Sequence, residues 1–135
     1  MPDIHKAGGL LIRDKKVLVS RTKGQELFIV PGGKLVPGET VEQALVREFF
    51  EEFRISIDAS GFQFFATYTA QAAYSPDKTV QMDTYLITAW EGDIIPDNEI
   101  AEILWVDSAV SRTVKIGSIL EFEVLPQLKE GGFIN

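Results

Sequence analysis

The sequence predicts one domain of the α/β (α+β) class, residues 1–135, in which helices cover the faces of a mixed β-sheet. The length of 135 residues suits a single domain. A hydrophobic share of 45% with 24% charged residues is ordinary for a globular protein. Strand-like runs, a long stretch of helix formers, more strand-like runs and a final helical stretch follow in that order, which is typical of such a sheet.

The N-terminal part of the chain carries the signals of short strands. Two apolar runs, 7–12 and 17–20, flank the polar residues 13–16, and this pattern predicts a β-hairpin. A further short strand is expected at 27–30, because Pro31-Gly32-Gly33 then stops it.

The middle of the chain predicts the main helix and two long strands. Residues 40 to about 53 are strong helix formers without Gly or Pro, and Thr40 is the expected N-cap. Two β-rich runs follow, 61–74 and 79–90, with 75–78 as the loop between them.

The C-terminal part predicts one more strand, at 100–106, and a last helix from Ile116 to about Leu128. Pro126 is expected to kink or interrupt that helix, because proline has no N–H to donate and its ring crowds the preceding turn. No linker or internal repeat divides the chain, so these stretches are expected to share one sheet.

Charge and residue usage exclude several chemistries. The chain has 13 Lys and Arg against 20 Asp and Glu, a net charge of −7, so no nucleic-acid partner is expected. There is no cysteine, and His5 is the single histidine, so zinc sites built on Cys or on several His are excluded. No stretch reaches the ~20 apolar residues of a membrane span, and the first residues do not resemble a signal peptide. A cytoplasmic protein without a membrane partner is expected, and a homodimer stays open.

The predicted main helix carries an unusual acidic cluster. Glu48, Glu51 and Glu52 stand at spacings i, i+3 and i+4, so they share one arc of about 100° and repel one another. A solvated acidic stripe would tolerate this repulsion, which amounts to a few tenths of a kcal/mol for each pair. A divalent cation is the alternative explanation, because hard Mg²⁺ prefers oxygen ligands.

A short glycine-containing loop before this helix favours the second explanation. In Pro31-Gly32-Gly33-Lys34, backbone N–H groups can approach an anion without obstruction by Cβ atoms. Arg47 adds a basic side chain to the helix. A phosphate-binding loop, a metal-binding helix and a basic side chain are the parts that phosphoryl-transfer chemistry requires.

These residues resemble the signature of the Nudix hydrolase family: Gly, five residues, Glu, seven residues, then Arg-Glu-apolar-any-Glu-Glu-any-Gly-apolar. Here Gly33 is followed at those spacings by Glu39 and by residues 47–55, Arg-Glu-Phe-Phe-Glu-Glu-Phe-Arg-Ile, so every charged position is filled. The one departure is Arg54, where the family has Gly. A left-handed helix end costs a non-Gly residue roughly 1–2 kcal/mol, so Arg54 must bear that strain or the loop must take another path.

The resemblance implies an α/β/α sandwich and a hydrolase, dependent on Mg²⁺ (or Mn²⁺), of a nucleoside diphosphate linked to another moiety. It implies that Glu48, Glu51 and Glu52 are metal ligands and form the catalytic set with Arg47. A structural ion pair of Arg47 with Glu39 is expected to hold the loop against the helix.

The substrate side of the site is expected to combine phosphate contacts with one stacking partner for a nucleobase. Phosphate contacts are expected from Arg21, Gly32, Gly33 and Lys34, and the stacking partner from Phe28 or Tyr74. Family members take a general base from a loop beyond the signature in many cases, and here the candidates stay open between Asp93, Glu99 and Glu102.

A small-molecule nucleotide is the expected partner. An ordinary or oxidised nucleoside triphosphate is the first choice, because Trp90-Glu91-Gly92 faintly resembles the triphosphate-cleaving, MutT-like branch of the family. ADP-ribose, nucleotide sugars and dinucleoside polyphosphates remain alternatives. So does a Nudix-like binding module without catalysis, for which Arg54 is the single argument.

Overall fold

The computed structural model describes residues 2–72 and 75–135. Its strands and helices are β1 (Ile4–Arg13), β2 (Lys16–Thr22), β3 (Gly32–Lys34), α1 (Val41–Phe53), β4 (Gln63–Ala72), β5 (Ser75–Ile87), β6 (Ile100–Val106) and α2 (Leu125–Glu130). The strands form one six-stranded sheet in the order β4-β5-β1-β2-β6, with β3 paired to β1 off this path. β1 and β5 are parallel and the other pairs are antiparallel, so the sheet is mixed as expected.

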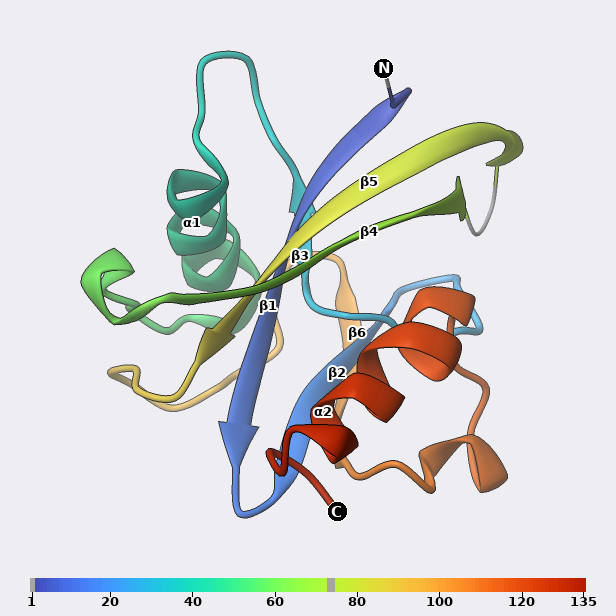
Figure 1. Ribbon diagram of the computed structural model, residues 1–135. Helices are drawn as coiled ribbons and strands as arrows, with labels where there is room; N and C mark the ends of the chain where they lie inside the picture. Colours follow the sequence, from blue (N-terminus) through green and yellow to red (C-terminus); the bar gives the residue numbers. More distant parts are fainter. Residues whose placement is uncertain (1, 73–74) are drawn as a thin grey trace.

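The sheet separates two hydrophobic clusters. Successive side chains of a strand point to opposite faces, so Leu10 and Leu11 of β1 belong to different clusters. Phe49 of α1 packs in the cluster of Leu11, and Leu128 of α2 packs in the cluster of Leu10. α1 and α2 accordingly lie on opposite sides of the sheet (Figure 1). The α/β/α sandwich is confirmed.

The predicted hairpin is confirmed. β1 and β2 pair from Arg13↔Lys16, and the two turn residues Asp14 and Lys15 both have positive φ, 54° and 62°. Two left-handed residues in a two-residue loop match the right-handed twist of the flanking strands.

The strand predicted at 27–30 is wrong, because this segment contributes only isolated bridges from Phe28 and Ile29. The third strand, β3, lies instead at Gly32–Lys34, where the sequence indicated a stop. Gly32 has φ 144° and lies against β1 so closely that a Cβ there would overlap the backbone carbonyl of Ala7. The glycine is therefore part of a close strand contact with β1.

The loop predicted at 75–78 is also wrong. These residues begin β5, which pairs with β4 by Ala72↔Ser75 and then Gln71↔Thr79. The register shift between the two pairs is a bulge that takes up the extra residues of β5, including Pro76. β5 ends at Ile87, three residues before the predicted end at Trp90.

The C-terminal helix is irregular next to Pro126 but is not broken there, since helical residues run from Ser118 to Glu130. A π-helical segment covers Leu120–Val124 and passes directly into α2, in which Pro126 stands in the first turn. The wider turn accommodates a residue that has no N–H to donate. No helix among the described residues is long and apolar enough to cross a membrane.

α1 follows its prediction at both ends. The side chain of Thr40 accepts a hydrogen bond from the Gln43 backbone N–H, and the Gln43 side chain accepts one from the Thr40 backbone N–H, which completes a capping box. At the other end Arg54 adopts the left-handed conformation, φ 58° and ψ 30°, that glycine provides at lower cost. Its Nε donates to Asp97 Oδ2 at 2.8 Å.

A pair of variants isolates the backbone strain at Arg54. Both Arg54→Gly and Arg54→Ala remove the exposed ion pair with Asp97, so they differ only in the residue at the left-handed position. We expect the free energy of unfolding of Arg54→Gly to exceed that of Arg54→Ala by about 1 kcal/mol. Urea denaturation measures the difference, and equal stabilities would show that the position carries no strain.

Candidate active site

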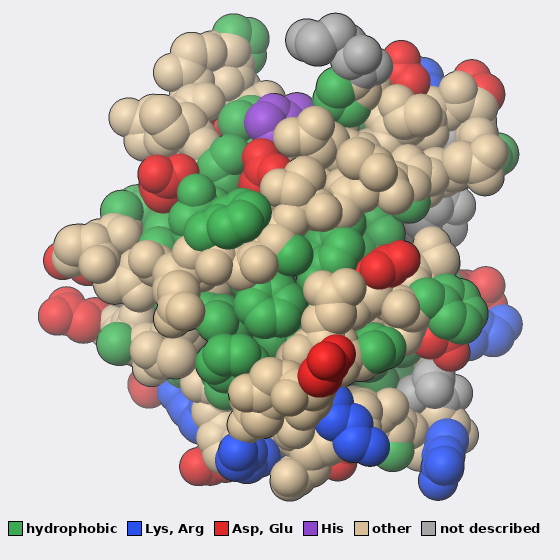
Figure 2. Space-filling model, in the orientation of Figure 1, with side chains coloured by type: hydrophobic (Ala, Val, Ile, Leu, Met, Phe, Trp, Pro, Cys, Tyr) green, Lys and Arg blue, Asp and Glu red, His purple; other side chains and the backbone are tan. Residues whose placement is uncertain are grey.

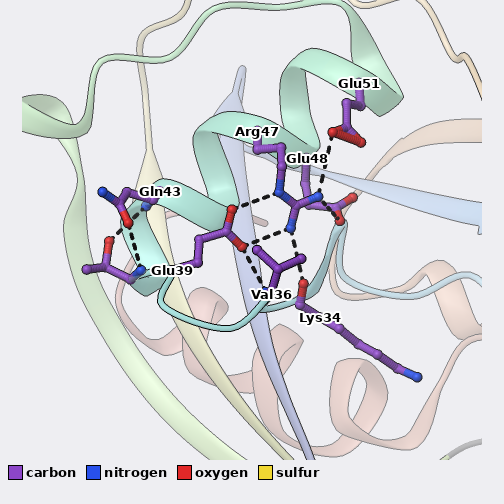
Figure 3. A network of polar contacts seen from close by, with 8 residues as sticks. Lys34, Val36, Glu39, Gln43, Arg47, Glu48 and Glu51 are labelled. Atoms are coloured by element: carbon purple, nitrogen blue, oxygen red, sulfur yellow. Dashed lines mark hydrogen bonds and ion pairs between the residues drawn. The ribbon is translucent and has the colours of Figure 1, made fainter.

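Arg47 and Glu39 fix the loop before α1 against the helix. The guanidinium donates to both carboxylate oxygens of Glu39, from Nε at 2.8 Å and from NH2 at 3.0 Å. Glu39 also accepts the Val36 backbone N–H at 3.1 Å. These contacts, the Arg47 hydrogen bonds first, lower the pKa of Glu39 to about 2. The ion pair expected between the two residues is present, and it bridges loop and helix (Figure 3).

Arg47 also reaches the acidic cluster. Its NH1 donates to Glu48 Oε1 at 2.9 Å and lies 3.7 Å from Glu51 Oε1. Its NH2 donates to the backbone carbonyl of Lys34 at 3.2 Å, while the Lys34 side chain extends away from this network (Figure 3). One arginine thus orients the loop and two of the three expected metal ligands.

Glu48 lies against the glycine loop. Its carboxylate occupies the space that a Cβ at Gly33 would fill, so the glycine makes room for it. The side chain is 14% exposed, and burial raises its pKa, although Arg47 opposes the shift. Glu48 is therefore a half-buried carboxylate that Arg47 holds against the glycine loop.

Glu52 carries an unpartnered oxygen. Among the described residues its Oε2 is a buried side-chain polar atom without a hydrogen-bond partner. Burial first, and then the charge of Glu48, raise the pKa of Glu52, while the backbone N–H of Glu99 lowers it. A buried carboxylate oxygen without a donor is costly unless a ligand or cation completes its contacts.

The expected convergence of the three glutamates on one point is not seen. Within residues 2–72 and 75–135, no three Asp, Glu, His or Cys side chains gather closely enough to hold a metal ion. Glu48 and Glu51 turn toward Arg47, whereas Glu52 turns toward Glu99. The donor set still fits a divalent cation, because it offers hard oxygens, mutual repulsion and the unpartnered Oε2 of Glu52. Binding requires the side chains to turn toward a common point.

A cavity of about 450 Å³ has Lys34, whose carbonyl accepts from Arg47, and Glu99, whose backbone N–H contacts Glu52, in its wall. The three glutamates of the cluster are not among its lining residues. Its charged lining residues are Lys6, Lys34 and Glu99, and Thr22 and Gln25 are among its polar ones. Apolar side chains of β1, β5 and the C-terminal helix form much of the remaining wall. The volume and the mixed lining suit a small organic anion.

Acidic charge is not confined to this site. Figure 2 shows Asp and Glu side chains spread over the face seen in Figure 1, with most of the visible Lys and Arg side chains in its lower half. Hydrophobic side chains lie between them in the middle of this face. Lys6 and Lys34 therefore lie together in a chain whose net charge is −7.

Two of the expected substrate contacts are engaged within the protein. Arg21 forms an ion pair with Glu102 at 3.2 Å and donates to the backbone carbonyl of Gln25 at 3.1 Å. Phe28 is 4% exposed and packs in the core, so its ring is not open to a nucleobase, contrary to the stacking role expected for it. Tyr74, the other stacking candidate, lies outside the described residues.

The three general-base candidates differ in place. Glu99 lines the cavity, and its backbone N–H contacts Glu52. Glu102 is the partner of Arg21. Asp93 lies in an exposed loop. The structure brings only Glu99 of these three to the wall of the cavity.

Lys6 is a cavity residue that the sequence reasoning missed. It is partly buried and stands opposite Lys34 in the pairing of β1 with β3. A usable signal was present, because a lysine directly precedes the apolar run of the first predicted strand.

Comparison with known proteins agrees with this architecture. A family model described as "NUDIX domain" matches residues 4–116. The 8-oxo-dGTP diphosphatase of Escherichia coli (strain K12) is 38% identical over 63 residues, which cover 47% of this chain and 45% of that protein. The protein of the same name from Haemophilus influenzae is 36% identical over 94 residues, 67% of this chain and 64% of that one.

Solved structures show the same fold. The solution structure of the E. coli ORF135 protein has a TM-score of 0.73 at 20% identity and covers 95% of this chain and 91% of that one. The matched region spans about half the length of the first curated relatives, 45% and 53%. The family model itself covers most of the sequence, from β1 to the residues before the last helix. The chain therefore belongs to the Nudix family.

Proposed function

We propose that this chain is a pyrophosphohydrolase that cleaves a phosphoanhydride bond in a nucleoside diphosphate linked to another moiety. The observation that carries the proposal is the buried and unpartnered Oε2 of Glu52. The backbone N–H of Glu99 contacts Glu52, and Glu99 lines a cavity that also holds Lys6 and Lys34. A buried carboxylate oxygen without a donor suits a cation, and lysines suit the phosphates that the cation would accompany.

We propose Mg²⁺, or Mn²⁺, as the cation, with Glu48, Glu51 and Glu52 as its ligands. When bound, such an ion neutralises phosphate oxygens and lowers the pKa of a bound water. Support comes from the oxygen-only donor set and from the raised pKa of Glu48 and of Glu52, both caused by burial.

The remaining roles follow from the contacts of each residue. Arg47 holds Glu48 and Glu51 in place from one side and the Lys34 carbonyl from the other. Lys34 directs its ammonium toward substrate phosphate, beside the backbone of Gly32 and Gly33. The geometry favours Glu99 over Asp93 and Glu102 as general base, because Glu99 lines the cavity.

A nucleoside triphosphate, ordinary or oxidised, is the proposed substrate. The curated relatives named 8-oxo-dGTP diphosphatase support this choice. A relative named RNA pyrophosphohydrolase, from Serratia proteamaculans, is 48% identical over 44 residues and makes a 5′-triphosphate on RNA a substrate worth including. A binding module without catalysis is less well supported, because every charged position of the signature is filled.

A nucleotide panel tests the proposal. The chain is incubated with dGTP, 8-oxo-dGTP, dATP, ADP-ribose, diadenosine tetraphosphate and a 5′-triphosphorylated RNA. Phosphate and pyrophosphate release are measured, and the nucleotide products are separated by anion-exchange chromatography, because ADP-ribose and diadenosine tetraphosphate release neither ion. We expect turnover of at least one triphosphate with Mg²⁺ and none after addition of EDTA. Absence of turnover across the panel with Mg²⁺ and with Mn²⁺ would contradict the proposed function.

A further inference from the structure

Two lysines face each other in the wall of the cavity. Lys6 of β1 and Lys34 of β3 are direct partners in the antiparallel pairing of these strands, and both line the 450 Å³ cavity. Like charges directly opposite on neighbouring strands destabilise a sheet. In a chain with a net charge of −7, pairing two cations here is unexpected on structural grounds.

The ammonium group of Lys6 has no partner of its own. Among residues 2–72 and 75–135, it forms no hydrogen bond and no ion pair, although the side chain is partly buried. Burial and the charge of Lys34 lower the pKa of Lys6, and only the more weakly acting charge of Glu48 raises it. A desolvated cation without a partner is unfavourable until an anion enters the cavity.

We propose that Lys6 is a substrate-binding residue that holds a phosphate group of the substrate together with Lys34. This inference rests on the proposed function and adds a residue outside the signature to it. A phosphate oxygen between the two ammonium groups would relieve their repulsion and satisfy the donors of Lys6. Glu48 lies against Gly33, the residue before Lys34, so this contact would lie next to the acidic cluster.

Pyrophosphate binding without metal tests the contact directly. The full chain, in EDTA, is titrated with inorganic pyrophosphate and followed by calorimetry, for the wild type, Lys6→Met and the control Lys16→Met. Lys16 is an exposed lysine at the start of β2. We expect Lys6→Met to weaken pyrophosphate binding about tenfold, because one charge-assisted contact is lost, and Lys16→Met to leave it unchanged.

A double variant tests whether the two lysines bind the same phosphate group. If they do, Lys34→Met weakens pyrophosphate binding much less in the Lys6→Met background than in the wild type. Additive losses would assign the two lysines to separate contacts and overturn the shared clamp.

Kinetics with whichever panel member is hydrolysed give an independent readout. We expect Lys6→Met to raise KM about tenfold with kcat within about threefold, and Lys6→Arg to restore most of the loss. The thermal midpoint of metal-free Lys6→Met is expected to equal or exceed that of the wild type, since an unpartnered, partly buried cation is removed.

Failure of the inference and failure of the proposed function give different results. Wild-type affinity for pyrophosphate in Lys6→Met overturns the role of Lys6, whether or not the chain hydrolyses nucleotides. Lack of turnover across the panel overturns the proposed function, while loss of pyrophosphate binding in Lys6→Met would still uphold the phosphate contact.

Amine acetylation of the wild type tests the same contact without any substitution. We expect pyrophosphate to protect Lys6 from acetylation, which mass spectrometry measures.

Discussion

Glu52→Gln is expected to lower kcat by at least about 10²-fold on any nucleotide that the wild type hydrolyses. Glu52 contributes the buried Oε2 that has no partner among the described residues, and the amide replacement cannot supply the negative charge that a divalent ion requires there. The Glu99 backbone N–H keeps an acceptor, because Gln retains one oxygen at this position. Initial rates with saturating Mg²⁺ measure the loss, with Glu130→Gln, an exposed residue at the end of α2, as the control.

The same variant is expected to keep or raise the stability of the metal-free protein. Burial and Glu48 raise the pKa of Glu52 above its ordinary value of 4.5, so the folded chain binds this proton more tightly than the unfolded chain. The destabilisation by Glu52 is therefore fully present above the raised pKa and disappears below about pH 4.5. Thermal midpoints should favour Glu52→Gln at pH 7.5, with a difference that shrinks toward pH 4.5. Near wild-type kcat in a folded Glu52→Gln would show that the metal is held elsewhere.

Local sequence signals were sufficient for the elements that local interactions define. Thr40 and Gln43 form the capping box that starts α1, and the polar residues Asp14 and Lys15 form a two-residue hairpin turn. The signature predicts either a left-handed helix end at Arg54 or a displaced loop, and Arg54 adopts the left-handed conformation. In each case the determining contacts lie within a few residues of one another.

Features that depend on distant segments could not be predicted in the same way. β3 is a strand because Gly32 and Gly33 lie against β1, a contact between segments more than 20 residues apart, whereas their composition alone indicates a turn. The Glu51 side chain points toward Arg47. Its direction depends on its rotamer, and the spacing of residues on a helix does not determine the rotamer. The pairing of Lys6 with Lys34 likewise appears only when the register of two strands is known.

Gly33→Ala is expected to reduce kcat/KM about ten- to a hundredfold while the chain stays folded. A Cβ at this position would overlap Glu48 Oε1, so the carboxylate must leave the place where Arg47 holds it. A misplaced ligand or catalytic group is costly even when the displacement is about 1 Å. Gly33 does not have a left-handed φ, so alanine adds no backbone strain there.

Gly61→Ala is the matched control, because a Cβ there meets nothing within 4 Å and φ is again not left-handed. Gly32→Ala is expected to lose stability instead of activity alone. Its Cβ would overlap the Ala7 backbone, and its φ of 144° disfavours alanine.

If Gly33→Ala acts by displacing Glu48, it has little further effect on kcat/KM in a Glu48→Gln background, because the carboxylate that it displaces is already gone. A full additional loss in that background would show that Gly33 acts by another route, through the loop backbone and its contact with phosphate.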